Sequence, residues 1–417
     1  MQHTPPATAR KELGNRGLVI YAGLITALGA FAVDSTLPMF VAMAAELGTG
    51  VDALPQTITV FLFAIGIGQL IFGPLSDRYG RRPVLAVGLS LNLIGALVCY
   101  FASTLDTMLL GRVIQGFGSG VGPAVGRAML RDRFTGDELA RQFAISVAVF
   151  SIGPIVGPLL GVSLVALGGS WRMIFGCMVL LSAGLLVVLV TRLPETLTTQ
   201  RLNALKPRVL LRDAKAIVGH PQSRYFMAMG VLSYVIIVFV LAGSPVVYAE
   251  NFGVTGALFA ILFALHAIGI IIGQVLNHRS ISRFGSVGTA LWAACWMALV
   301  LASMWGVSAA GLADAYVISG LIVLFAVGFL TVQVNSNALA MTPHGRIAGF
   351  AASFLGSSGQ IIGSIVASAV LPLVGFSLTR WTAALMITSI LVLMMLLLWI
   401  RRHGFHASDG HSENQDD

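Results

Sequence analysis

Long apolar stretches alternate with short polar connections along almost the whole chain. Each stretch has about 20 residues or more, the length of helix that crosses about 30 Å of hydrocarbon. The pattern therefore predicts an all-α polytopic membrane protein with about twelve spanning helices. The expected spans are residues 18–45, 54–75, 84–103, 107–130, 140–167, 171–192, 225–249, 255–276, 287–306, 312–338, 347–374 and 381–400.

Composition supports a chain that is mostly dissolved in lipid. Of the 417 residues, 57% are hydrophobic and only 10% are charged, unlike a soluble domain. The net charge of +8 could point to a nucleic-acid binder, but the basic residues are spread over short connections, so we expect no nucleic-acid partner. Cys99, Cys177 and Cys295 lie inside apolar stretches without metal-ligand or redox spacing, so we expect no metal and no cofactor.

The charges of the connections predict the orientation of the chain. Alternate connections are basic, as cytoplasmic loops are, with Arg78, Arg81, Arg82, Arg131, Arg133, Arg141, Arg279, Arg283, Arg346, Arg401 and Arg402. The opposite connections hold Glu46, Asp52, Asp106, Glu250 and Asp314, with Arg172 and Arg380 as their basic residues. We therefore expect both termini in the cytoplasm, and a first span too long for a cleaved signal peptide.

A longer basic connection divides the spans into two sets of about six. The expected organisation is a cytoplasmic tail at 1–17, a helical bundle at 18–192, a cytoplasmic linker at 193–224, a second bundle at 225–400 and a cytoplasmic tail at 401–417. Weak echoes relate the halves, such as Gly73–Arg82 with Gly273–Arg283 and Trp171-Arg172 with Arg380-Trp381. Taken alone, the echoes fit chance or duplication equally well.

Asp34 is the acidic residue that the pattern places deep within a span. A carboxylate at the bilayer centre costs about 2.5–3.5 kcal/mol even on lenient insertion scales, so such a residue is a functional candidate by default. We expect Asp34 to face a cavity and to carry a proton, with Pro38 bending the helix one turn later. The alternative is an aspartate that only bonds a neighbouring helix.

Arg112 is the basic counterpart, near the start of the fourth predicted span. Gln115 lies three residues later on the same helical face, so the two predict a polar strip directed into the bundle. An electrostatic interaction with Asp34 is one interpretation. Snorkelling of Arg112 to the extracytoplasmic surface is the other.

The connection from residue 73 to residue 83 carries the most specific motif. It reads GPLSDRYGRRP and resembles the signature G-x-L-x-D-R-x-G-R-[KR] of the major facilitator superfamily. The resemblance implies two parallel six-helix bundles around a central cavity, with a gating loop formed by Gly73, Asp77, Arg78, Gly80, Arg81 and Arg82. In that family Asp77 would bridge neighbouring arginines and a helix N-terminus in the other half, which carboxylate–dipole attraction makes reasonable.

The fifth predicted span holds glycines every four residues and two prolines, at Gly153, Pro154, Gly157, Pro158 and Gly161. Small residues at this spacing let helix backbones approach, and prolines bend the helix, so we expect a kinked helix packed against the other half. The segment resembles the signature of drug–proton antiporters, although Val162 replaces its last glycine. Ordinary glycine-mediated packing is the alternative.

Further motifs resemble the branch that exports bicyclomycin and chloramphenicol. They are Asp34-x-x-Leu37-Pro38, Arg112-x-x-Gln115-Gly116-x-Gly118, Arg127-x-x-x-Arg131-Asp132, Leu193-Pro194-Glu195-Thr196 and Ser244-Pro245. The resemblance implies a proton-coupled efflux antiporter of the bacterial inner membrane that acts as a monomer on small, largely apolar compounds. Asp34 and Arg112 would couple protons, and Asp34, Arg112, Gln115 and Asn335 would line the substrate cavity.

Two rival functions follow from the same residues. A proton-coupled importer of a small nutrient could have the same fold, and the kinked fifth span argues against it. For Asn335 and the other polar residues of the second half, a helix-to-helix hydrogen bond is at least as reasonable as a cavity position. An enzyme is not expected, because no paired catalytic carboxylates and no H-E-x-x-H or G-x-S-x-G motif occur.

Overall fold

The computed structural model describes residues 12–200 and 205–405, and within these ranges the chain is helical with no strand. The first half contains α1 (Asn15–Asp34), η1 (Leu37–Met39), α2 (Phe40–Leu47), η2 (Val51–Ala53), α3 (Pro55–Tyr79), α4 (Arg81–Tyr100), α5 (Leu105–Ser119), α6 (Val121–Arg133), α7 (Gly136–Phe150), α8 (Ile152–Ala166) and α9 (Arg172–Arg192). After α10 (Pro207–Gly219), the second half contains α11 (Pro221–Phe252), α12 (Gly256–Ala264), α13 (His266–Ala309), α14 (Ala315–Met341), η3 (Thr342–Ile347), α15 (Ala348–Val374) and α16 (Leu378–His403).

Among the described residues, 10 helical segments are long and apolar enough to cross a membrane. One of them, Gly256–Ala309, has 54 residues. Gly285 within it has non-helical φ and ψ of 66° and 177°, so this segment holds two crossings. The helices α5 and α6 are too short singly, but only Gly120 separates them and it keeps a right-handed helical conformation. With these two additions, the structure agrees with the predicted number of about twelve spans.

Local sequence explains where several helices begin and end. Gly48 and Gly253 end α2 and α11 in the left-handed conformation, with φ of 65° and 64°, which glycine adopts without steric cost. Thr104 and Asp314 stand before α5 and α14, and their side chains accept backbone N–H groups of the first turn. These caps satisfy donors that have no partner within the helix.

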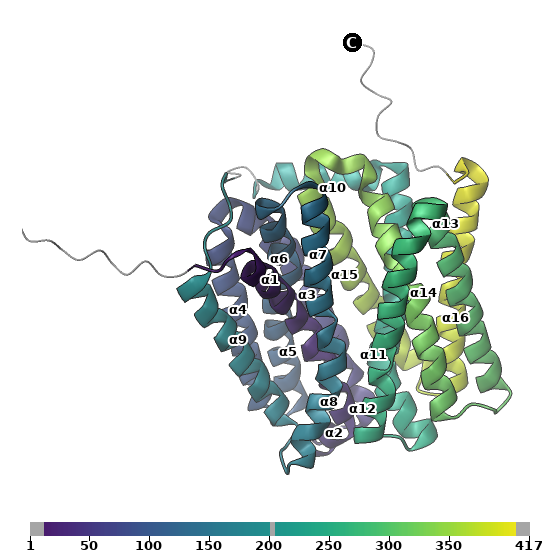
Figure 1. The fold of residues 1–417 in the computed structure, drawn as a ribbon. Helices are drawn as coiled ribbons and strands as arrows, with labels where there is room; N and C mark the ends of the chain where they lie inside the picture. Colours follow the sequence, from purple (N-terminus) through teal and green to yellow (C-terminus); the bar gives the residue numbers. More distant parts are fainter. Residues whose placement is uncertain (1–11, 201–204, 406–417) are drawn as a thin grey trace, which may run out of the picture.

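The helices form two groups that lie side by side, α1 to α9 in one and α11 to α16 in the other (Figure 1). Within the groups, α4 packs on α5 and α9, and α13 packs on α14 and α16. Between them, α3 contacts α15 and α11, and α8 contacts α12. Figure 1 places α10 and the end of α16 at one end of the molecule, with α2 and α12 at the opposite end.

The connection between the two groups contains a helix of its own. We predicted a basic cytoplasmic linker, and the helix α10 within it is amphipathic. Its Asp213 and Ile217 are buried, and the helix packs on α11 and α15. The expected tails at 1–17 and 401–417 lie largely outside the described residues, as do positions 201–204 of the linker.

Candidate functional site

The first span is interrupted in its middle. Helix α1 ends at Asp34, and the chain continues through the 3-10 turn η1 into α2. Pro38 has no N–H to give the carbonyl of Asp34 four residues earlier. The carbonyls of Phe31 and Val33 accept the hydroxyls of Ser35 and Thr36, at 2.6 and 2.8 Å, in addition to the backbone N–H groups of the same two residues. Asp34 therefore stands at a helix break inside the membrane.

The side chain of Asp34 is buried, and no described residue pairs with it. Its residue is only 4% exposed. Within the described parts of the chain, its carboxyl forms no hydrogen bond and no ion pair. A buried carboxyl without a cation is costly in its charged form. The arrangement therefore suits a group that exchanges a proton or binds a cationic or hydrogen-bonding ligand.

Arg112 points into the bundle from α5 and is 1% exposed. Its guanidinium donates to the carbonyls of Ala32 at 3.0 Å and Thr57 at 3.3 Å, and to Oε1 of Gln115 at 3.0 Å. It also lies over the ring of Phe61, 4.2 Å from the centroid. One nitrogen, Nη2, has no partner among the described residues. Burial excludes snorkelling, and the contact with α1 goes to its backbone near Asp34 rather than to the carboxylate.

Helix α8 packs directly on the break in α1. A Cβ added at Gly157 would lie 3.2 Å from the backbone nitrogen of Ser35 and 3.3 Å from Cβ of Asp34. At Gly161 it would lie 2.7 Å from the carbonyl oxygen of Ser35. Pro158 lies within α8, and Pro154 follows the interruption at Ser151 that separates α7 from α8. The same helix contacts α12 of the second half, so it links the Asp34 region to the interface between the halves.

The glycines of α8 are expected to respond to alanine in a graded way. At Gly161 the added methyl group meets a backbone oxygen that cannot move away, so Gly161→Ala should destabilise the protein by about 1–3 kcal/mol. At Gly153 the nearest atom would be 3.6 Å away, which is ordinary contact, and alanine favours a helix over glycine by about 1 kcal/mol. Thermal unfolding in detergent measures both. Equal midpoints for the two variants would contradict this account of the α1–α8 contact.

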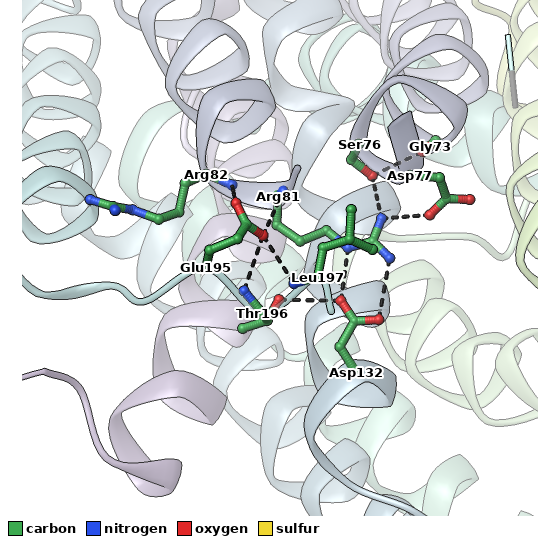
Figure 2. A network of polar contacts seen from close by, with 9 residues as sticks. All are labelled: Gly73, Ser76, Asp77, Arg81, Arg82, Asp132, Glu195, Thr196 and Leu197. Carbon is green, nitrogen blue, oxygen red and sulfur yellow. Dashed lines mark hydrogen bonds and ion pairs between the residues drawn. The ribbon is translucent and has the colours of Figure 1, made fainter. Parts of the chain in front are cut away.

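A second polar cluster lies at the end of the molecule that carries α10 (Figure 2). Its centre is Arg81, whose side chain is 5% exposed. The guanidinium binds Asp132 of α6 through two nitrogens, at 2.8 and 3.2 Å, and Asp77 of α3 at 2.6 Å. It also donates to the hydroxyl of Ser76 at 2.7 Å. One arginine therefore joins α3, α4 and α6.

Glu195 occupies the N-terminus of α4 in the same cluster (Figure 2). Its carboxylate accepts the backbone N–H groups of Arg81 at 2.9 Å and Arg82 at 3.0 Å. It also accepts those of Thr196 and Leu197, both at 3.0 Å. A carboxylate at this position satisfies free donors and interacts favourably with the helix dipole. The segment after α9 is thereby held against the turn between α3 and α4.

Five of the predicted gating-loop residues lie at or next to this turn, whereas Gly73 lies within α3, six residues before its end. Gly80 is the single residue between α3 and α4, with φ of 103°, and a Cβ there would lie 2.8 Å from the Glu195 carboxylate. Gly73 accepts a hydrogen bond from Ser76, and Arg82 donates to carbonyls near the end of α9. Arg78 contacts only the Tyr79 ring among the interactions of the described residues. Asp77 bonds Arg81, but no bond joins it to the described N-terminus of α15.

A cavity of about 520 Å³ lies between the two halves next to this cluster. Asp77 and Arg81 line it from the first half, Asp213 from α10, and Phe350 and Ser353 from α15. Asp34, Arg112, Gln115 and Asn335 do not line it. The assignment of these residues to a substrate cavity thus stays a prediction.

Asn335 lies apart from the other predicted site residues. It is 1% exposed on α14, and its amide nitrogen donates to Asn277 of α13 at 2.6 Å and to the carbonyl of Thr331 at 2.8 Å. This is a hydrogen bond between packed helices. Gln115, by contrast, is fully buried beside Arg112 and donates to the sulfur of Met178 at 3.0 Å.

The sequence did not lead us to predict the contacts that Asp132 and Glu195 make. Both residues belong to motifs quoted above, but their interactions with Arg81 and with α4 were not anticipated. A signal was present, because each acid lies close to arginines in the sequence: Asp132 stands between Arg131 and Arg133, and Glu195 follows Arg192 by three residues. A nearby cation or a helix N-terminus stabilises the charged form of such a carboxylate.

Comparison with known proteins identifies the fold family. The model of the Major Facilitator Superfamily matches residues 22–367, which is most of the chain. The chain belongs to the major facilitator superfamily. It is therefore a multi-pass membrane transporter and not an enzyme.

Relatives within the superfamily include proteins named for drug resistance. A bicyclomycin resistance protein homolog of Haemophilus influenzae is 30% identical over 84% of this chain and 88% of its own length. Multidrug resistance protein D of Escherichia coli is 27% identical over 94% of this chain and 96% of its own. The structure of the xylose transporter XylE from Escherichia coli, in a partially occluded inward open conformation, superposes with a TM-score of 0.71 at 14% identity. It covers 93% of this chain and 97% of that chain, and it shows the shared fold.

Proposed function

We propose that the protein is a proton-coupled antiporter that exports small, largely apolar compounds of the amphenicol or bicyclomycin type. The observation that carries the proposal is the Asp34 carboxyl, which is buried at a helix break and has no partner among the described residues. Intramembrane acids of this kind mark proton relays and substrate sites. The drug-resistance names of two relatives support the substrate class.

The proposed cycle is alternating access by a monomer in the bacterial inner membrane, with both termini in the cytoplasm. The two halves rock about the region of Asp34, which binds a proton from outside and releases it inside as substrate replaces it. Each proton that moves inward through 100 mV supplies about 2.3 kcal/mol, in addition to its pH difference. That energy supports an export gradient of tens-fold with one proton per cycle.

The neighbours of Asp34 have separate parts in this proposal. Arg112 holds the carbonyl of Ala32 and so positions the end of α1. Helix α8 contacts both the break and α12, so a change at Asp34 can alter the interface between the halves. The Arg81 cluster braces the cytoplasmic end of the first half, where the cavity opens between the halves.

Proton release on substrate addition tests the proposed function. Inside-out vesicles with an acidic lumen would receive an amphenicol, a bicyclomycin-like compound, a cationic dye or a sugar, and a pH-sensitive dye would report the lumen. We expect alkalinisation with at least one of the first three compounds and none in vesicles without the protein. If none of the first three compounds changes the lumenal pH and the sugar does, the proposal of drug export is wrong and nutrient import takes its place.

A further inference from the structure

We infer that the groove between the first turn of α11 and the last turn of α16 binds the headgroup of an anionic phospholipid from the cytoplasmic leaflet. The groove is a cavity of about 330 Å³, and Arg224, Tyr225, Trp399, Arg402 and His403 line it. Its described lining residues all belong to the second half, and Asp34 is not among them. The inference therefore does not depend on which compound is transported.

The charges of this groove match an anion. Arg224 and Arg402 are exposed, and within the described ranges neither forms an ion pair. None of the described residues that line the cavity is acidic. Guanidinium groups bind phosphate oxygens through charge-assisted hydrogen bonds, often two at a time. Basic pockets between spanning helices on the cytoplasmic side are typical binding sites for acidic headgroups.

The indole of Trp399 gives an independent sign of a missing partner. Trp399 is 5% exposed, and its Nε1–H has no acceptor among the described residues. Buried indole N–H groups usually find an acceptor. Neighbouring rings fix the indole, because His403 stacks on it with centroids 4.1 Å apart and Phe226 lies 4.9 Å away. This nitrogen is itself covered, so a headgroup oxygen in the groove reaches it only when a covering side chain moves aside.

The surroundings suit a lipid better than a free anion. Tyr225 and Trp399 are of the residue types that gather where headgroups meet hydrocarbon, and the Tyr225 hydroxyl is held by the carbonyl of Met395. About one and two turns before Arg402 on α16, Leu398 and Met394 are 47% and 52% exposed. They offer an apolar surface for acyl chains directly next to the arginines. A soluble phosphate would use only the charged half of this arrangement.

Native mass spectrometry of the full chain in detergent tests the inference, with phosphatidylglycerol and phosphatidylcholine as probes. We expect wild type to retain phosphatidylglycerol selectively, and Arg224→Gln and Arg402→Gln each to weaken its binding about fivefold, equivalent to about 1 kcal/mol per arginine. Trp399→Phe, which keeps the ring and removes only the N–H, should weaken it about threefold. Equal retention by wild type and the double arginine variant would overturn the inference.

Matched controls separate this groove from general surface charge. Arg279 and Arg283 are exposed on α13, and Arg279→Gln with Arg283→Gln removes the same charge as the double variant. We expect that control to bind phosphatidylglycerol like wild type, and an equal loss would overturn the specific site. Displacement of the lipid by millimolar inorganic phosphate would mean a simple anion site. Binding that appears only after truncation behind Phe405 would mean that the acidic C-terminal segment occupies the groove instead.

Discussion

Asp34→Asn is expected to reduce substrate-induced proton release by about tenfold or more, to the level of vesicles without the protein. The amide has nearly the same shape as the carboxyl but cannot exchange a proton. Because Asp34 forms no hydrogen bond or ion pair within the described ranges, the substitution breaks no such structural contact. Folding should therefore be unaffected, and the loss should fall on coupling alone.

The matched control for this result is Asp106→Asn. Asp106 is an exposed acid in the first turn of α5, in the same half of the protein, and its substitution makes the same chemical change. We expect proton release in this variant to equal that of wild type. Proton release by Asp34→Asn at half the wild-type rate or more would show that another group carries the proton. A lowered thermal midpoint in Asp34→Asn would instead indicate a structural role.

Arg81→Ala is expected to have the largest effect on stability, about 3–5 kcal/mol, because removal of one partner leaves largely buried charges uncompensated. The substitution removes the only cation bonded to Asp77 and Asp132 among the ion pairs of the described residues. Arg78→Ala provides the control, since Arg78 contacts only a tyrosine ring there. We expect that variant to stay within about 0.5 kcal/mol of wild type.

Unfolding of purified protein in a detergent titration measures these differences, and a double substitution tests their origin. In Arg81→Ala with Asp132→Asn, fewer unpaired charges remain, so the combined destabilisation should be smaller than the sum of the single effects. Simple additivity would mean that Arg81 and Asp132 stabilise the fold independently. Similar losses in Arg78→Ala and Arg81→Ala would remove the reason for treating Arg81 as the centre of the cluster.

The lengths of the apolar stretches predicted the spanning helices, because backbone groups in lipid must be satisfied within helices, and the resemblance of residues 73–82 to the superfamily signature predicted the two-bundle arrangement. The details that these predictions missed come from backbone breaks. Asp34 was expected in mid-helix, whereas the structure ends α1 there and continues through a 3-10 turn. Pro38 signalled a bend, but the side-chain bonds of Ser35 and Thr36 that complete the break depend on local geometry.

The sequence predicted those features of the candidate site that depend on charge or on spacing within one helix, and it did not predict contacts between helices. Arg112 and Gln115 share a face at three-residue spacing, and they are hydrogen-bonded in the structure. The position of Asn335 depended on how α13 and α14 meet, because the same amide can line a cavity or join two helices. Likewise, the partnership of Arg81 with Asp132 spans distant parts of the chain, and a single sequence carries no record of such a contact.

The contact between α8 and α12 also determines how the transporter should respond to ionic strength. Neither helix contains a charged residue, so the force that holds the halves together there is apolar packing, which dissolved ions do not screen. At the opposite end, the ion pairs of Arg81 join helices of the first half to one another and do not cross to the second half. On the proposed orientation the α8–α12 contact lies at the exterior end. The free energy of separating α8 from α12 should therefore not depend on charge screening by salt in the medium.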